Sequence, residues 1–174
     1  MNFNNAIDRM GATILLVEDD PRDTELTLLA LAEFKLANRV TTVSNGLDAM
    51  DYLLCRGAFH ARVSGNPLVV LLDNKIPKMT GLEVLKLMKA DERLRRIPVV
   101  ALTSSRQAPD LVAFYKLGVN ACVVKPVDFS EFMKAIQQVG IFWLALNIPP
   151  PGPATTACKV GNRQSEIPST LSSV

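Results

Sequence analysis

The chain has 174 residues, of which 48% are hydrophobic and 21% are charged, and its formal net charge is +2 at pH 7. This length suits one globular domain with an appendage and excludes two large domains. The small charge and the lack of a basic block exclude a typical nucleic-acid-binding surface. The apolar run ATILLV near the amino terminus is interrupted by EDD, so we expect neither a signal peptide nor a membrane association, and we expect a cytoplasmic protein.

Five apolar runs alternate with five helical patterns along the chain. The first helical pattern has Asp20 as its expected cap and Pro21 in its first turn. The second begins at a Ser-Asn cap, and glycine follows it. The runs expected as strands are residues 12–17, 39–43, 67–72, 97–102 and 121–125, and the helical patterns that follow them are 20–34, 44–57, 82–89, 109–117 and a last one from about 128.

The apolar spacing of the first two helices predicts which side chains they bury. Positions three or four residues apart share one face of a helix. The side chains expected on these faces are Leu26, Leu29, Ala30 and Phe34 in the first helix, and Leu47, Met50 and Leu54 in the second.

The alternation of strands and helices predicts the α/β class, with a parallel sheet covered by helices on both faces. The middle strands are apolar throughout, as buried parallel strands are. In an open sheet of this kind, ligands bind at the carboxyl ends of the strands.

Polar residues stand at four of these five strand ends. Glu18 and Asp19 follow the first strand, Asp73 the third, Thr103 the fourth and Lys125 the fifth. Three carboxylates held close together stay ionised only if a cation is shared between them. Oxygen ligands favour Mg²⁺, so we expect Asp19 and Asp73 as direct ligands and Glu18 as a ligand through water.

The remaining polar groups at this edge suit phosphoryl transfer. The ammonium of Lys125 can pair with Asp73 in the empty site and with a phosphate oxygen in the filled one. Thr103 supplies a hydroxyl donor. A carboxylate nucleophile, a metal ion, a lysine and a hydroxyl are the groups this chemistry requires, so Asp73 is predicted to accept a phosphoryl group.

At this point the motifs ILLVEDDP, LLDNKIPKMTGLEVL, VVALTS and GVNACVVKPVDF resemble, in order, the receiver domain of two-component response regulators. The resemblance covers about residues 12–146. It implies the flavodoxin-like fold, whose five-stranded parallel sheet has the order 2-1-3-4-5. It also implies that a sensor histidine kinase phosphorylates the chain, and that the chain is a signalling phosphoacceptor, which assists its own phosphotransfer and dephosphorylation, and not an enzyme.

The resemblance assigns roles residue by residue. Asp73 is the phosphoacceptor, and Glu18 and Asp19 are the acidic pair. The backbone carbonyl of Lys75 is a further ligand of Mg²⁺. The switch hydroxyl and lysine are Thr103 and Lys125, and the Lys125–Pro126 peptide is expected to be cis.

A narrower resemblance concerns EDDPRDTEL, the DAMDYL helix, the insert CRGAFHARVSGNP and the ending FWLALNIPPP. These segments are similar to single-domain regulators partnered with bacterial and cyanobacterial phytochrome histidine kinases, so the implied partner is a phytochrome or another sensor kinase. The sequence departs from the family at Cys122, where a switch tyrosine or phenylalanine is usual, and at Asn74 and Thr80.

The three cysteines, Cys55, Cys122 and Cys158, are odd in number and form no CxxC motif. Their spacing is typical of neither a disulfide framework nor a zinc site. We therefore expect three reduced thiols.

Three other functions share parts of this pattern. An Asp-nucleophile phosphatase would have a second aspartate at position 75, where Lys75 stands. A flavodoxin-type electron carrier would have a phosphate-binding loop after the first strand, and that loop is missing. A degenerate receiver acting only as a binding module is the remaining alternative, and labelling with acetyl phosphate separates it from a phosphoacceptor.

The expected organisation is an amino-terminal lead (1–11), the receiver domain (12–139), an apolar helical arm (140–151) and a low-complexity tail (152–174), with no effector domain. The run IFWLALNI is apolar around the whole helix, and one domain can cover only one side of it. We therefore expect a homodimer in which Phe142 and Trp143 are the anchors. Output is expected through protein contacts.

Overall fold

The computed structural model describes residues 13–33, 39–62, 65–104 and 108–148. Its five strands form one parallel sheet in the order β2-β1-β3-β4-β5, which confirms the predicted flavodoxin-like topology. The expected lead, the tail and the end of the arm lie outside the described residues. The strands are β1 (Ile14–Val17), β2 (Val40–Val43), β3 (Val69–Asp73), β4 (Val99–Thr103) and β5 (Ala121–Val124).

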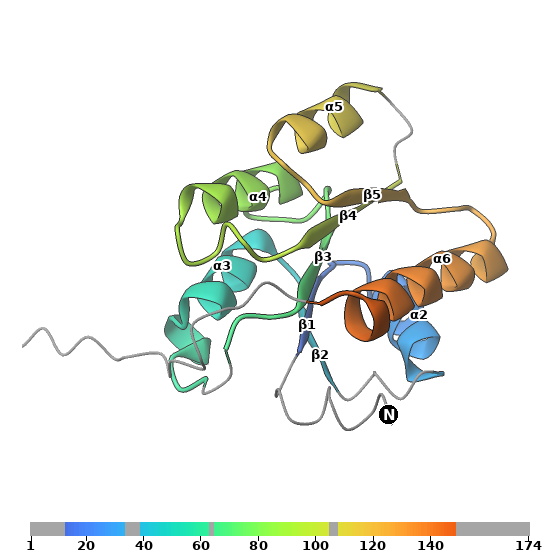
Figure 1. The fold of residues 1–174 in the computed structure, drawn as a ribbon, viewed down its shortest axis with the longest axis horizontal. Coiled ribbons are helices and arrows are strands. Elements are labelled where there is room, and N and C mark those ends of the chain that lie inside the picture. The colour runs from blue at the N-terminus through green and yellow to red at the C-terminus, as the bar shows by residue number, and fades with distance from the viewer. Residues whose placement is uncertain (1–12, 34–38, 63–64, 105–107, 149–174) are drawn as a thin grey trace, which may run out of the picture.

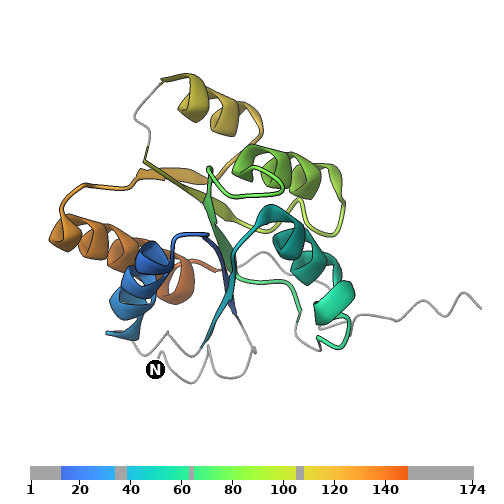
Figure 2. The ribbon, with the colours of Figure 1, turned by 180° about the vertical axis from the view of Figure 1, so that it is seen from behind.

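Helices cover both faces of the sheet (Figures 1 and 2). One face carries α2 and α6, and the other carries α3, α4 and α5. None of the described helices is long and apolar enough to cross a bilayer. The helices are α2 (Pro21–Ala32), α3 (Gly46–Leu54), α4 (Gly81–Ala90), α5 (Ala108–Lys116) and α6 (Phe129–Ile141), with a 3-10 turn at Gly57–Phe59 and a π-helical turn at Phe142–Leu146.

The alternation of side chains along β1 builds a core on each face of the sheet. Ile14 and Leu16 pack toward α2 and α6, whereas Leu15 and Val17 pack toward α3 and α4. Every residue of β3 and β4 is buried, so the prediction of continuously apolar middle strands is confirmed up to their polar last residues.

Two of the predicted core positions are wrong. Leu29 is 50% exposed and Leu47 is 46% exposed, and each lines a surface groove. The buried stripe of α2 instead consists of Thr27, Ala30 and Leu31. The reason is the direction in which each helix docks, which a run rich in leucine does not reveal, because leucines occupy several faces of α2. Phe34 lies outside the described residues.

Two further expectations are corrected. The Lys125–Pro126 peptide is trans, since no cis peptide bond occurs in the described part of the chain. The trans isomer is the more stable one for most X–Pro bonds, by about 0.5–1 kcal/mol. Cys55, which follows α3, is disulfide-bonded, so the expectation of three reduced thiols is wrong. Its side chain is only partly buried, and spacing along the chain does not show which thiols meet in the fold. Cys122 is a free thiol, as expected, and Cys158 lies outside the described residues.

Candidate functional site

The parallel register brings the polar strand ends to one edge of the sheet. Val17 pairs with Leu72, the residue before Asp73. Asp73 pairs with Leu102, the residue before Thr103. Since β3 lies between β1 and β4, Asp73 occupies the middle of this edge.

The three predicted carboxylates meet there. Oxygens of Glu18, Asp19 and Asp73 lie within 4.8 Å of one another. Glu18 and Asp73 are buried, whereas Asp19 is exposed. The backbone N–H of Asp20 donates to Oε1 of Glu18 at 3.3 Å, which orients that carboxylate. This set of hard oxygen donors, open on one side, fits a divalent metal ion.

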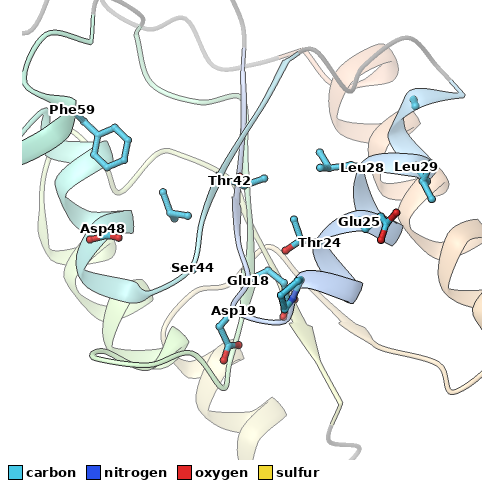
Figure 3. Close-up of a pocket in the computed structure, with 13 residues that line it drawn as sticks. Glu18, Asp19, Thr24, Glu25, Leu28, Leu29, Thr42, Ser44, Asp48 and Phe59 are labelled. Atoms are coloured by element: carbon cyan, nitrogen blue, oxygen red, sulfur yellow. The ribbon is translucent and has the colours of Figure 1, made fainter.

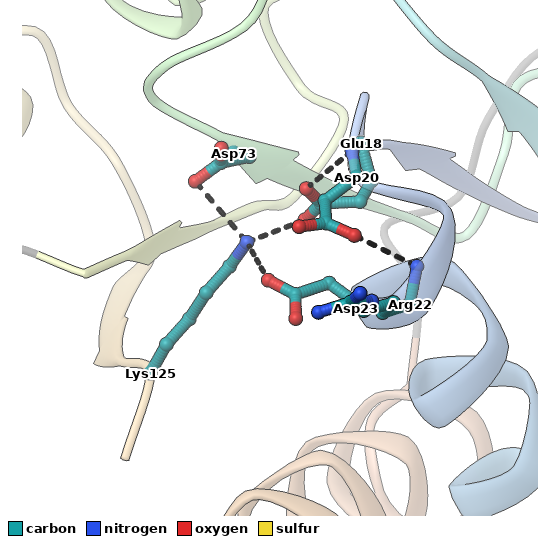
Figure 4. Close-up of polar contacts among 6 residues, drawn as sticks. All are labelled: Glu18, Asp20, Arg22, Asp23, Asp73 and Lys125. Carbon is teal, nitrogen blue, oxygen red and sulfur yellow. Dashed lines mark hydrogen bonds and ion pairs between the residues drawn. The ribbon is translucent and has the colours of Figure 1, made fainter. Parts of the chain in front are cut away.

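Lys125 reaches into this cluster from the end of β5 (Figure 4). Its Nζ donates to Oε2 of Glu18 at 2.6 Å and to Oδ2 of Asp23 at 2.7 Å. The distance from Nζ to Oδ1 of Asp73 is longer, at 3.5 Å. The expected pairing of Lys125 with Asp73 is therefore present, but the lysine is held more closely by two other carboxylates.

Burial and charge together set the protonation of this pair. Burial raises the pKa of Glu18 to about 7, against the opposing effect of the hydrogen bond from Lys125, and the nearby charge of Asp73 raises it further. For Lys125, burial acts to lower the pKa, but the hydrogen bonds to Asp23 and Glu18 and the negative charges of Asp73 and Glu18 together outweigh burial, and the pKa is raised. Lys125 is therefore a cation at neutral pH. Because the pKa of Glu18 is about 7, its carboxyl group is protonated in part of the molecules at that pH.

The loop after β3 is held tightly against the acceptor. The N–H of Gly81 donates to the carbonyl of Asn74 at 3.0 Å, and a Cβ at position 81 would overlap the backbone carbonyl of Asp73. Thr80 and Glu83 form a capping box that starts α4 at the same point. Only glycine permits this close approach. Asp73 is therefore held by the pairing of β3 on one side and by the packed loop on the other.

An open groove of about 700 Å³ leads away from the acidic cluster, between α2 and α3 (Figure 3). Glu18 and Asp19 lie at its acidic end. Leu28 and Leu29 line its α2 side, and Phe59 lies on the opposite side. The cluster is thus accessible from solvent along a partly apolar path.

The structure brings together Glu18, Asp19, Asp73 and Lys125 as predicted. Thr103 is buried at the end of β4, and the N–H of Lys125 donates to its carbonyl at 2.7 Å. Lys75 is exposed in the loop after β3, and the ligand role of its carbonyl stays a prediction.

Sequence reasoning missed Asp23, the second short partner of Lys125. A signal for it exists, because Asp23 lies in the first turn of α2, three residues after the cap Asp20. Helical side chains lean toward the amino terminus, which here points at the acidic cluster. A carboxylate at this position is therefore directed toward any cation at the strand ends.

Cys122 lies on β5, at the position where the resemblance implied a switch aromatic. Its side chain is partly buried against the core below α4 and α5. Burial raises the pKa of the thiol, and a hydrogen bond with Tyr115 opposes that effect. Cys122 is therefore a protonated core thiol at neutral pH.

The chain matches the family model of the response regulator receiver domain over residues 14–137. It is 37% identical to response regulator Rcp1 of Synechocystis sp. over 131 residues, 75% of this chain and 88% of the relative. The solved Mn²⁺-bound form of Rcp1 is similar with a TM-score of 0.73 and 35% identity, and the match covers 80% of this chain and 99% of that one.

Two other solved structures are similar. The phosphorylated cyanobacterial phytochrome response regulator RcpA has a TM-score of 0.75 and 36% identity, over 80% of this chain and 99% of that one. The bacteriophytochrome response regulator RtBRR is 57% identical with a TM-score of 0.65, over 81% of this chain and 85% of that one. With its sheet order, its acidic cluster and these similarities, the chain belongs to the response regulator receiver family, whose members are signalling proteins.

Proposed function

We propose that this protein is a single-domain response regulator that accepts a phosphoryl group from a sensor histidine kinase on Asp73 and signals through protein contacts. The observation that carries the proposal is the cluster in which Asp73 lies beside Glu18, Asp19 and the ammonium of Lys125. The similarity to RcpA, solved in a phosphorylated form, supports it.

The proposed chemistry uses this chain's own groups at three points. A carboxylate oxygen of Asp73 attacks the phosphorus of a phosphohistidine, the P–N bond breaks, and the imidazole leaves with the electron pair of that bond. Lys125 donates a hydrogen bond to a phosphoryl oxygen, and the hydroxyl of Thr103 donates another. Attack of water on the acyl phosphate later releases inorganic phosphate and restores the carboxylate.

The carboxylate cluster is also the proposed site of Mg²⁺. Asp19 and Asp73 would ligate the ion, with Glu18 and the carbonyl of Lys75 completing the protein's contribution. When bound, the ion neutralises charge on the transferred phosphoryl group. The similarity to Rcp1, solved in a Mn²⁺-bound form, supports a divalent ion at this edge.

Replacing Asp19 by alanine is expected to weaken Mg²⁺ binding at least about tenfold, because the substitution deletes an exposed ligand without opening the core. Calorimetric titration with MgCl₂ measures this effect. Glu25→Ala is the matched control, since Glu25 is an exposed carboxylate on the same groove but outside the cluster. Equal affinities for the two variants would remove Asp19 from the site.

A degenerate receiver that acts without phosphorylation is the second candidate. Glu18 and Asp73 together with Lys125 would then form only a buried ion-pair network. Incubation of the wild-type protein with acetyl phosphate and MgCl₂ distinguishes the two, with a chelator as the control. We expect a mass increase of one phosphoryl group only when Mg²⁺ is present, and an unlabelled protein would favour the binding module.

A phytochrome histidine kinase is the proposed phosphodonor. The proposed location is the cytoplasm, where ATP is available for the kinase to phosphorylate itself. The support is the similarity to RcpA and RtBRR, which are described as phytochrome and bacteriophytochrome response regulators. A phosphotransfer profile against purified sensor kinases tests the assignment. The partner kinase should label the protein faster than the other kinases at equal concentration.

We propose further that residues 12–139 act as the receiver and that residues 140–151 dimerise it. Phe142 is 51% exposed, Leu146 65% and Ile148 89%, so an apolar strip follows α6 on the surface. Trp143 instead packs partly against the core under α2 and α6, with its ring edge-on to Phe142 at 5.0 Å. The proposed anchors are therefore the exposed side chains of Phe142, Leu146 and Ile148. Trp143, which was also expected as an anchor, packs on the domain and supports Phe142 through their ring contact.

The double variant Phe142→Glu/Leu146→Glu is expected to convert a dimer into a monomer at micromolar concentration, because each protomer would bury two unpaired charges in the interface. Sedimentation velocity measures the change. Phe129→Glu is the matched control, since Phe129 is 55% exposed at the opposite end of α6. The proposal fails if the double variant sediments as the same species as the wild type.

A further inference from the structure

The ammonium of Lys125 faces three carboxylates, and one of them, Asp23, has no role in the proposed phosphoryl chemistry. An ammonium carries three N–H donors. Two are used at short distance, by Glu18 at 2.6 Å and Asp23 at 2.7 Å, and Asp73 lies at 3.5 Å. The third donor faces Asp73, so a short bond to a phosphoryl oxygen there would draw the ammonium away from the two carboxylates that hold it at short distance.

We propose that Asp23 is a positioning residue that holds Lys125 on the α2 side of the site before phosphorylation and competes for it with the phosphoryl group once Asp73 is phosphorylated. The inference rests on the proposed function of Asp73. The Asp23–Lys125 ion pair then connects α2 to the end of β5. Weakening this ion pair is part of the free energy needed to form the phosphorylated state.

The backbone around Asp23 explains why its carboxylate is a fixed acceptor. Asp20 caps α2, and its side chain accepts from the N–H of Arg22 at 2.8 Å, so the first turn of the helix is ordered. Asp23 projects from this turn toward Nζ of Lys125 (Figure 4). Its side chain is 31% exposed, against 1% for Glu18, so Asp23 holds the lysine from the more open side of the site.

Asp23 also differs from the other two partners of Lys125 in its alternatives. Glu18 and Asp73 belong to the carboxylate cluster and can be neutralised there by another cation, whereas Asp23 lies outside that cluster. Lys125 is the one side-chain cation within ion-pair distance of Asp23 in the described part of the chain. Asp23 therefore keeps competing for the lysine after the cluster is neutralised.

The test uses beryllium fluoride, which mimics a phosphoryl group on a carboxylate, added to the full chain with saturating MgCl₂. Asp23→Asn should bind it about three- to tenfold more tightly than the wild type, as expected for the loss of one competing, partly exposed ion pair. Fluorine NMR of the bound ligand measures the affinity. Asp20→Asn is the matched control, because it removes the same charge from the same end of α2, keeps a capping side chain and lies outside the carboxylates that pair with Lys125 in the described part of the chain.

A second measurement does not depend on phosphoryl chemistry. In the protein without beryllium fluoride, NMR of the Lys125 side chain should show a faster-exchanging ammonium in Asp23→Asn and an unchanged one in Asp20→Asn. An unchanged ammonium in Asp23→Asn would overturn the proposal, as would equal tightening in both variants, which would make the effect one of charge alone. Unchanged or weaker affinity in Asp23→Asn would overturn it as well. If the wild type failed to bind beryllium fluoride, the proposed function would fall, and the ammonium signal would still decide whether Asp23 positions Lys125.

Discussion

Replacing Asp73 by asparagine is expected to abolish phosphoryl labelling, whether the donor is acetyl phosphate or a phosphorylated kinase. An amide oxygen is a poor nucleophile, and the amide cannot form the acyl phosphate. The expected loss is complete within detection, at least about a thousandfold in rate, because this substitution removes the attacking atom itself. Intact-mass spectrometry after incubation with acetyl phosphate and MgCl₂ measures the product.

The fold should survive this substitution. Asparagine has nearly the same shape as aspartate, and the loop around position 73 is held by the backbone contact between Gly81 and Asn74. Loss of one charge also relieves repulsion with Glu18 and Asp19, so the melting temperature without metal should be equal or higher. Glu25→Gln, an exposed change on α2, is the control and should label normally. Label retained by Asp73→Asn would place the acceptor elsewhere.

The main elements of this fold could be predicted from periodicity and capping alone. Asp20 caps α2 and Asn45 caps α3, as the capping residues predicted, and β3 and β4 are buried at every position. The strand order followed from the receiver resemblance, because alternation of strands and helices predicts a parallel sheet without giving its order. Leu29 and Leu47 were misplaced, since hydrophobicity alone does not distinguish the sheet-facing side of a helix from the wall of a groove.

The candidate site was predictable because parallel strands end at one edge. That geometry brings Asp19 and Asp73 together, although 54 sequence positions separate them, and Lys125 arrives at the same edge from β5. Which carboxylate the lysine prefers was not predictable. That choice depends on distances of about an ångström between side chains, as the 2.7 Å contact with Asp23 and the 3.5 Å contact with Asp73 show.

Replacing Lys125 by alanine is expected to destabilise the metal-free protein by about 3 kcal/mol, because it removes the cation that faces two buried carboxylates. The side chains concerned are 11% exposed for Lys125 and 1% for Glu18, so water cannot replace the lost partner fully. Glu18 can relieve part of the loss by taking up a proton, since its pKa already lies near 7.

Saturating Mg²⁺ should return the free energy of unfolding of Lys125→Ala to about that of the wild type without Mg²⁺. A ligand present at a hundred times its dissociation constant stabilises the folded state by about 2.7 kcal/mol, and the carboxylates freed from Lys125 should bind the ion at least as tightly as before. Urea unfolding with and without MgCl₂ measures both effects. Lys134→Ala is the control, because Lys134 forms an exposed pair with Glu131 and its loss should cost less than about 1 kcal/mol.

The same variant separates phosphorylation from its consequence. Asp73, Asp19 and the metal site remain in Lys125→Ala, so labelling by acetyl phosphate should persist at a reduced rate. The lysine that would leave Asp23 for the phosphoryl group is absent, so no signal should pass to β5 and α6. We therefore expect phosphorylation to change the sedimentation of the wild type but not of Lys125→Ala. An unaltered response in this variant would show that the switch does not run through Lys125.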